Sequence, residues 1–254
     1  MRLGFAGSGN MAAALARGWA AGEGGPETMM FCDLDAERAR TLAAEVRGET
    51  RGSLPELVRD VDVIVLAVKP GALDDVAREL EGEASALISV LAATTTGSVA
   101  EAFPGVPALR VMPNQPVEVR RGVLCYPPPV QMPDDLLAAL LELLGLLGTL
   151  VPLEERLIDP AMAVMSSSPA YIALVAEALA RAGEREGLEP RVCGELVARA
   201  LAGTAELLLK KDPAAIRAAV ASPGGATEAG LSQLEGVVEN AFASAVTASL
   251  ERFR

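Results

Sequence analysis

Short apolar runs alternate with amphipathic segments through the first half of the chain. The apolar runs, which are typical of strands buried on both faces of a sheet, lie at residues 2–6, 28–32, 62–68, 85–91, 109–112, 122–126 and 149–151. Segments with helical periodicity lie between them, at residues 13–21, 36–46, 53–59, 72–80 and 136–147. Strands and helices that take turns in this way predict a doubly wound α/β domain with a parallel sheet. We expect residues 122–126 to form an edge strand of that sheet.

Strand signals stop after Leu153, and the rest of the chain has the pattern of helices. These helices are expected at residues 161–165, 170–186, 191–211, 212–221, 227–235 and 236–252. Ser166–Pro169 is expected to cap the second of them, because serine side chains accept hydrogen bonds from a helix start. We therefore predict an α/β domain at residues 1–153 and an all-α domain at residues 154–254.

The two long helices of the second half, 170–186 and 191–211, carry Ala, Leu and Val on nearly all faces. A helix that is apolar around most of its circumference must be buried on most sides. About 100 residues are too few to surround two such helices. We therefore expect the all-α domain to form an interface between subunits.

Charge and composition exclude several classes of partner. The chain has 254 residues and a net charge of −12, which argues against nucleic acids and anionic membrane surfaces as partners. The longest apolar stretch, residues 136–153, is interrupted by Glu142, two glycines and Pro152, so we expect no membrane-spanning segment there.

Histidine is absent from the sequence, which excludes catalysis by a histidine base and histidine metal ligands. The three cysteines, Cys32, Cys125 and Cys193, lie far apart without metal-ligand spacing, so we expect no metal site and no disulfide framework. The N-terminus leads directly into a glycine motif and does not have the pattern of a signal peptide. These features predict a protein of the reducing cytoplasm.

The glycine motif Gly7–Ala12 has the form G-x-G-x-x-A and lies between the first strand and the first helix. This is the context of a dinucleotide-binding loop. In such loops the first glycine permits a tight turn, the second lets the pyrophosphate approach the backbone, and the small third residue lets the helix pack on the sheet. The motif predicts a Rossmann-type domain that binds a dinucleotide.

Asp33 follows the second strand, roughly 20 residues after the glycine motif, where an acidic residue binds a ribose 2′-hydroxyl. A structural alternative is that Asp33 or Asp35 caps the helix 36–46, and both roles are compatible. The turn Asp33–Asp35 carries no arginine, although Arg38 is one helical turn further on. The two carboxylates favour NADH over NADPH as the cofactor.

Two polar residues at strand ends have open interpretations. Lys69 precedes a proline at a strand end, where it would pair with phosphate, act in acid–base chemistry, or remain a solvated loop residue. Asn114, between Pro113 and Pro116, is either a turn residue that bonds nearby backbone or an amide directed into a cleft.

Ser222–Thr227, with the sequence Ser-Pro-Gly-Gly-Ala-Thr, precedes the predicted helix 227–235. Pro223 and the two glycines end the preceding helix and are expected to leave backbone N–H groups free at the next helix start. Such N–H groups and the helix dipole favour an anion there. The structural alternative is an ordinary capped helix.

Taken in order, several motifs resemble those of one enzyme family. They are Phe5–Ala12, Ala67–Pro70, Arg110–Asn114, Ser167–Tyr171, Glu177–Leu179 and Ser222–Thr227. In order and spacing the chain resembles pyrroline-5-carboxylate reductase along essentially its whole length. The resemblance implies a Rossmann-type domain followed by a helical domain that forms an intertwined homodimer, often assembled into a decamer. It also implies reduction of (S)-1-pyrroline-5-carboxylate to L-proline with NADH or NADPH, the last step of proline biosynthesis.

The resemblance also implies roles for individual residues. The cofactor-binding residues it implies are Gly7, Ser8, Gly9, Asn10, Met11, Asp33, Ala67, Val68, Lys69, Pro70 and Asn114. The substrate-binding residues it implies are Ser222, Gly224, Gly225, Ala226 and Thr227. In this assignment backbone N–H groups bind the substrate carboxylate, and the hydroxyl of the catalytic residue Thr227 contacts the ring nitrogen. Hydride transfer to an imine needs a cofactor and correct orientation, which agrees with the absence of histidine.

Some positions depart from the family pattern. Met165 and Ser166 replace a Ser-Gly pair, Gln115 stands where threonine is usual, and Ala93 occupies a position that is usually glycine. Two alternatives therefore remain open. One is a reductase of a related cyclic imino acid, and the other is a non-catalytic homologue that binds a dinucleotide.

Overall fold

The computed structural model describes residues 1–80 and 82–252, and these residues form two compact units. The first unit comprises Met1–Ser167 and the second comprises Ser168–Glu251. The domain boundary between residues 153 and 154 stays a prediction, and the last two residues of the predicted all-α domain lie outside the described residues. Each unit is described by itself below.

The first unit contains a six-stranded parallel sheet with the strand order β3-β2-β1-β4-β5-β6. The strands are β1 (Arg2–Ala6), β2 (Thr28–Cys32), β3 (Glu49–Thr50), β4 (Val63–Leu66), β5 (Leu87–Ser89) and β6 (Ala108–Arg110). The strand order reverses between β1 and β4, which are neighbours in the sheet. This arrangement confirms the predicted Rossmann-type domain, and it places a topological switch point beside β1.

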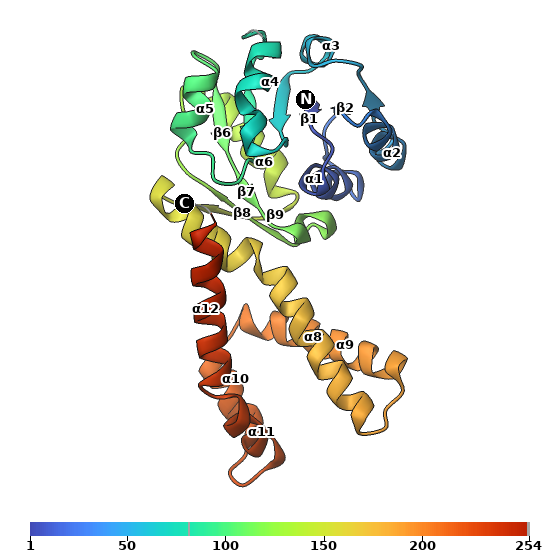
Figure 1. The fold of residues 1–254 in the computed structure, drawn as a ribbon, viewed down its shortest axis with the longest axis vertical. Coiled ribbons are helices and arrows are strands. Elements are labelled where there is room, and N and C mark those ends of the chain that lie inside the picture. Colours follow the sequence, from blue (N-terminus) through green and yellow to red (C-terminus); the bar gives the residue numbers. More distant parts are fainter. Residues whose placement is uncertain (81, 253–254) are drawn as a thin grey trace. The chain divides into compact units, whose positions relative to one another are not determined.

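Helices cover both faces of this sheet (Figure 1). One face packs against α1 (Asn10–Ala20), α2 (Ala36–Val46) and α6 (Asp134–Gly145). The other face packs against α3 (Leu54–Asp60), α4 (Leu73–Leu80) and α5 (Thr96–Ala102). Successive strand residues alternate between the two cores because side chains point to opposite faces of a strand.

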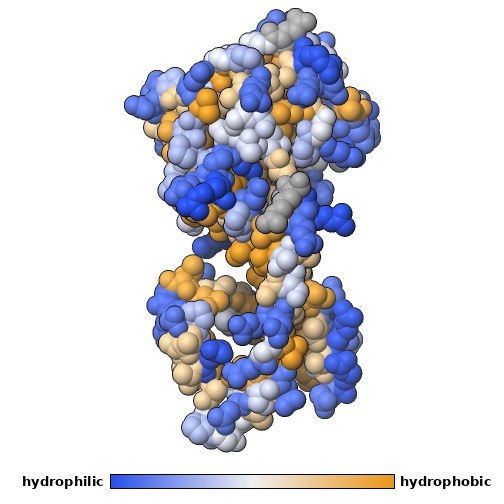
Figure 2. All heavy atoms as spheres, turned by 60° about the vertical axis from the view of Figure 1, so that its left-hand side comes forward, coloured by the Kyte–Doolittle hydropathy of each residue, from blue (hydrophilic) through white to orange (hydrophobic). Residues whose placement is uncertain are grey.

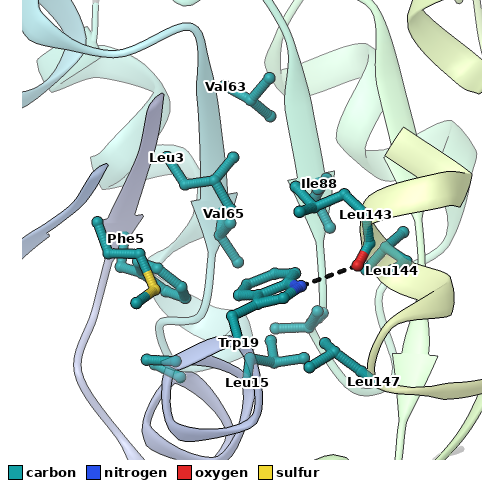
Figure 3. Packing of buried hydrophobic residues seen from close by; sticks show 14 of the residues in the cluster. Leu3, Phe5, Leu15, Trp19, Val63, Val65, Ile88, Leu143, Leu144 and Leu147 are labelled. Carbon is teal, nitrogen blue, oxygen red and sulfur yellow. Dashed lines mark hydrogen bonds between the residues drawn. The ribbon is translucent and has the colours of Figure 1, made fainter. Parts of the chain in front are cut away.

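Trp19 fixes α1 against both the sheet and α6 (Figure 3). Its indole N–H donates a hydrogen bond of 2.9 Å to the carbonyl oxygen of Leu143. Its ring lies edge-on to Phe5 of β1, with 6.3 Å between the ring centroids. These contacts anchor the C-terminal part of α1 to the sheet and to α6.

The prediction that residues 122–126 extend the main sheet is wrong. These residues form β8 (Gly122–Tyr126) in a separate three-stranded sheet, between β7 (Met112–Pro113) and β9 (Gly148–Pro152). The predicted strand 109–112 is also divided, because β6 ends at Arg110 and β7 pairs with β8. Parallel pairing of β8 with β9, a contact between residues distant in sequence, places residues 122–126 outside the main sheet.

The sequence-based prediction does not include α5. Thr96, Gly97 and Ser98 are poor helix formers, but the Thr95 hydroxyl accepts a hydrogen bond from the Ser98 N–H at 3.1 Å. The Glu155 carboxylate also accepts the Thr96 N–H, at 3.2 Å. A cap supplied from 59 residues away in the sequence is invisible to local patterns.

The segment before the long helices differs from the expected serine cap. The chain passes through η3 (Glu155–Leu157), α7 (Ile158–Ala161) and η4 (Met162–Ser166), a π-helix, before α8 begins at Ser168. Ser166 is thus inside a helical segment, and its hydroxyl donates to the carbonyl oxygen of Pro113 at 3.3 Å. The Ser166 hydroxyl therefore makes a tertiary contact with β7.

The second unit consists of helices: α8 (Ser168–Arg185), α9 (Pro190–Leu208), α10 (Pro213–Val220), α11 (Ala226–Leu234) and α12 (Val237–Glu251). In the described part of this unit Cys193 is the only buried residue. Large apolar side chains lie exposed among charged ones, as Figure 2 shows. By length and composition the helical run Glu155–Arg185 is also apolar enough to cross a membrane. An unburied apolar surface of this extent requires a covering partner.

Candidate functional site

Three loops follow neighbouring strands at the carboxyl edge of the main sheet. The Gly7 N–H donates to the Cys32 carbonyl at 2.8 Å, which ties the glycine loop to the end of β2. The Ala67 N–H donates to the Ala6 carbonyl at 2.9 Å, and the Val90 N–H donates to the Leu66 carbonyl at 3.1 Å. The loops after β1, β4 and β5 therefore lie side by side at the edge where doubly wound sheets bind ligands.

Gly7 and Gly9 have different structural demands. Gly7 has φ of +97°, and a Cβ atom there would lie 2.7 Å from the Ala67 carbonyl oxygen, so only glycine fits. A Cβ atom on Gly9 would meet no protein atom within 4 Å. The space in front of Gly9 is open, as a close approach of a ligand to the backbone requires.

The start of α1 has the properties of an anion site. Among the residues that the structure describes, no side chain caps α1 at Gly9, and the first turn of this helix carries no acidic residue. The hydroxyl of Ser8, a residue only 3% exposed, has no hydrogen-bond partner among the described residues. Unpaired N–H groups and a buried unpaired hydroxyl beside open space fit the pyrophosphate of a dinucleotide.

Asp33 holds the glycine loop in place. One carboxylate oxygen accepts the Ser8 N–H at 2.6 Å, and the other accepts the Asp35 N–H at 2.9 Å. Each oxygen retains a lone pair for a ribose hydroxyl. Asp35 accepts the Arg38 N–H at 3.2 Å and caps α2, which confirms the capping alternative for Asp35.

A groove of about 830 Å³ lies next to the glycine loop. It is lined by Ser8, Gly9, Asn10, Ala13, Arg17, Asp35, Glu37, Arg38, Thr41, Leu42, Glu45 and Gln115. Its size is in the range of small-molecule sites. The groove brings three predicted cofactor residues together with the start of α2. The predicted residues Ala67–Pro70 and Asn114 do not line it.

Asn114 is committed to structural hydrogen bonds. Its side-chain oxygen accepts the Val123 N–H at 2.9 Å, and its amide group donates to the Met165 carbonyl at 3.2 Å. The side chain thus joins β8 to the π-helix. Lys69 is exposed at the end of the β4 strand, and within residues 1–80 and 82–252 its side chain has no ion pair.

The Ser222–Thr227 segment forms the start of a helix, as predicted, with Ala226 and Thr227 as the first two residues of α11. Two of its N–H groups, however, are not free. The Gly225 N–H donates to the Ser222 carbonyl at 2.9 Å, and the Gly224 N–H donates to the Glu228 carboxylate at 2.7 Å. Neither the Ala226 N–H nor the Thr227 hydroxyl makes a hydrogen bond to a described residue. Gly224 has φ of +70°, which favours glycine there.

Sequence reasoning missed Glu228. Gly225 is the N-cap of α11, so Glu228 is the third helical residue, and its carboxylate reaches back across the helix start. This resembles a capping box, whose glutamate lies three residues after the cap. This spacing can be read from the sequence and identifies Glu228 as a partner of the Ser222–Gly225 loop.

Two family models match the chain. Residues 155–254 match the model described as pyrroline-5-carboxylate reductase dimerisation. Residues 2–93 match the model described as NADP oxidoreductase, coenzyme F420-dependent.

Curated relatives and solved structures match nearly the whole chain. The pyrroline-5-carboxylate reductase of Synechocystis sp. is 34% identical over 258 residues, covering 99% of this chain and 97% of that protein. That of Thermus thermophilus is 35% identical over 260 residues, with 99% and 97% coverage. The Plasmodium falciparum pyrroline carboxylate reductase structure with NADP bound has a TM-score of 0.87 at 28% identity, covering 100% of this chain and 97% of that chain.

Proposed function

Because the chain belongs to the pyrroline-5-carboxylate reductase family, we propose that it reduces (S)-1-pyrroline-5-carboxylate to L-proline with NAD(P)H. The observation that carries the proposal is the likeness across 99% of the chain, which covers both units. The open space at Gly9 beside an uncapped helix start supports the cofactor half of the proposal. The reaction is the last step of proline biosynthesis.

The reaction divides into hydride supply and substrate orientation. When bound, the nicotinamide would supply a hydride to the carbon of the imine protonated on its ring nitrogen, and this addition gives the product amine. The protein's contribution is to bind both molecules and to orient the imine, which is catalysis by positioning. The glycine loop and Asp33 would hold the cofactor, and Ala67–Pro70 would lie on its nicotinamide side.

The substrate half of the proposal rests on the loop before α11. The Ala226 N–H, at the helix start, binds the substrate carboxylate, together with the Gly224 N–H if Glu228 releases it. The hydroxyl of Thr227 hydrogen-bonds the ring nitrogen. We propose Thr227 as the catalytic residue, and Ser222, Gly224, Gly225 and Ala226 as its substrate-binding neighbours.

Substitution of Thr227 tests this assignment. Thr227→Ala removes the hydroxyl and should lower kcat/KM by roughly ten- to a thousandfold, the range of one oriented hydrogen bond. Thr227→Ser retains the hydroxyl and serves as the matched control, with activity close to that of wild type. If Thr227→Ala had the same kcat/KM as wild type, Thr227 would have no catalytic role.

We further propose that NADH is the preferred cofactor. Asp33 and Asp35 present two carboxylates at the end of β2, where a 2′-phosphate would lie. Arg38 lines the groove, but its guanidinium lies 3.5 Å from Asp35 and is already paired. These two carboxylates would repel the 2′-phosphate of NADPH, which disfavours NADPH as the cofactor.

The exposed tip of this turn offers a clean test of cofactor choice. Leu34 is fully solvent-exposed, so substitution there should not disturb the fold. Leu34→Arg adds a cation and should raise kcat/KM with NADPH about tenfold relative to NADH. Leu34→Gln, without the charge, is the control. A wild-type enzyme that prefers NADPH would contradict the proposal.

The protein is an oligomer, since its second half belongs to a dimerisation family and leaves apolar helices uncovered. We propose that a second copy covers these helices in a homodimer. Further assembly of such dimers would give a decamer. The apolar run Glu155–Arg185 then faces protein and not a bilayer. Light scattering after size exclusion should give the mass of a dimer or a multiple of it, without detergent.

A cytoplasmic location is part of the same proposal. The three cysteines are unpaired and buried, as expected in a reducing compartment. Cell fractionation tests this point, and recovery of the protein with membranes would contradict it.

A further inference from the structure

A buried arginine at the end of β6 joins two segments that are distant in sequence. The Arg110 side chain is only 2% exposed, and its guanidinium pairs with the carboxylate of Glu155. A second guanidinium nitrogen lies 3.4 Å from Asp159. A buried charge is tolerated only when it is paired, so this cluster holds the η3 and α7 segments against β6.

The same glutamate caps α5. One oxygen of Glu155 accepts the Thr96 N–H at 3.2 Å, and the other accepts the Thr96 hydroxyl. Burial alone would raise the pKa of Glu155, but the hydrogen bonds from Thr96 and the charge of Arg110 lower it overall. The carboxylate is therefore ionised at neutral pH, and Thr96 is held at a defined position.

The loop of residues 90–95 connects β5 to this anchored residue. At its start the Val90 N–H bonds the end of β4, and inside it Ala93 adopts φ of +52°. A left-handed conformation is unfavourable for alanine and persists only where surrounding contacts impose it. Anchors at both ends, β5 and Thr96, are the contacts that impose it here.

The 90–95 loop lies at the half of the sheet that is opposite to the adenosine half of a dinucleotide site. The groove and Asp33 lie on the β1–β3 half of the sheet, which is the adenosine half of a dinucleotide site. The other half of the dinucleotide must then lie over the carboxyl ends of β4 and β5. The 90–95 loop follows β5 at that edge.

We propose that Glu155 is a positioning residue which, through Thr96, holds the 90–95 loop against the nicotinamide half of the bound dinucleotide. The inference rests on the proposed function only in taking the ligand to be a dinucleotide. It assigns Glu155 no contact with the cofactor. Its effect should be confined to ligands that carry the nicotinamide ring.

Equilibrium binding to the full-length protein separates this role from general destabilisation. NADH and ADP-ribose, which lacks nicotinamide, are titrated against wild type and Glu155→Ala by calorimetry. The variant should raise the Kd for NADH about five- to twentyfold, because the loop that borders the nicotinamide is no longer held in place, and leave the Kd for ADP-ribose within about twofold. Glu154→Ala is the matched control, because Glu154 is exposed and, among the described residues, forms an ion pair only with Arg156 at the surface.

Equal weakening of NADH and ADP-ribose, or no change in either, would overturn the proposal. If Glu155→Ala does not fold, Thr96→Val removes one hydrogen bond and leaves the Arg110–Glu155 pair intact. That variant should raise the Kd for NADH alone by about threefold or more, and an unchanged Kd would equally overturn the proposal. Wild-type protein that binds NADH without reducing pyrroline-5-carboxylate would refute the proposed function and not this inference.

Discussion

Gly9 offers a substitution that should damage cofactor binding without damaging the fold. A Cβ atom at Gly9 would meet no protein atom within 4 Å, and the backbone there has φ of −73° and ψ of −173°, which alanine adopts without strain. Replacing glycine also reduces the conformational entropy of the unfolded chain. Gly9→Ala should therefore change the free energy of unfolding by no more than about 1 kcal/mol.

The methyl group would occupy the open space in front of α1, where the pyrophosphate approaches the helix N–H groups. Loss of one hydrogen bond to a charged group costs about 1.5–3 kcal/mol. That energy corresponds to a rise of about 10- to 150-fold in the Kd for NADH.

Gly7→Ala is the matched contrast. Its φ of +97° is unfavourable for alanine, and its Cβ would lie 2.7 Å from the Ala67 carbonyl oxygen. Stability should fall by about 2–4 kcal/mol, from backbone strain and overpacking together. Of the two variants, only Gly9→Ala should raise the Kd for NADH without a large change in the free energy of unfolding.

The assay combines urea unfolding at fixed protein concentration, since an oligomer's stability depends on concentration, with NADH titration by calorimetry. If Gly9→Ala bound NADH within about twofold of wild type, the glycine loop would not hold the pyrophosphate. If Gly9→Ala unfolded as readily as Gly7→Ala, the reasoning from local geometry would be wrong.

Other substitutions test the packing of the first unit. Gly18→Ala should lower the free energy of unfolding by about 1–3 kcal/mol in urea, because its Cβ would lie 2.2 Å from the Val117 carbonyl oxygen. Trp19→Phe should cost about 1–3 kcal/mol, since the buried Leu143 carbonyl loses its donor, while NADH affinity stays unchanged. Arg2 hydrogen-bonds Asp62 and lowers the pKa of that carboxyl. When the pKa of a carboxyl is lower in the native state than in the unfolded state, its ionised form stabilises the native state at pH values above the unfolded-state pKa. This stabilisation is lost as the pH falls through the native-state pKa. Asp62→Asn should therefore lose no more than about 1 kcal/mol near neutral pH and show a shallower acid limb in pH-dependent unfolding.

Sequence patterns predicted the structure correctly where it depends on residues that are close together in the chain. The glycine motif, the alternation of strands and helices, and the cap at Asp35 each depend on residues a few positions apart. The Rossmann-type domain was predictable for that reason. The uncovered apolar helices α8 and α9 likewise indicated an interface, because apolar periodicity is readable without a partner.

The features that could not be predicted from the sequence depend on contacts between residues that are distant in the chain. The second sheet depends on pairing of β8 with β9, from Gly122 to Pro152, which no local pattern encodes. The cap on α5 comes from Glu155, and the structural role of Asn114 comes from its bonds to Val123 and Met165. Within the candidate site, Glu228 was readable as a capping glutamate, whereas its bond to Gly224 required the folded loop.

Turnover by the purified protein tests the central claim most directly. Pyrroline-5-carboxylate is added with NADH or NADPH, cofactor oxidation is followed by absorbance, and the product is identified by chiral chromatography. Piperideine-6-carboxylate is the comparison substrate. We expect one L-proline for each cofactor oxidised, with pyrroline-5-carboxylate the better substrate. Absence of oxidation with both cofactors and both substrates would contradict the assignment of this chain as a reductase.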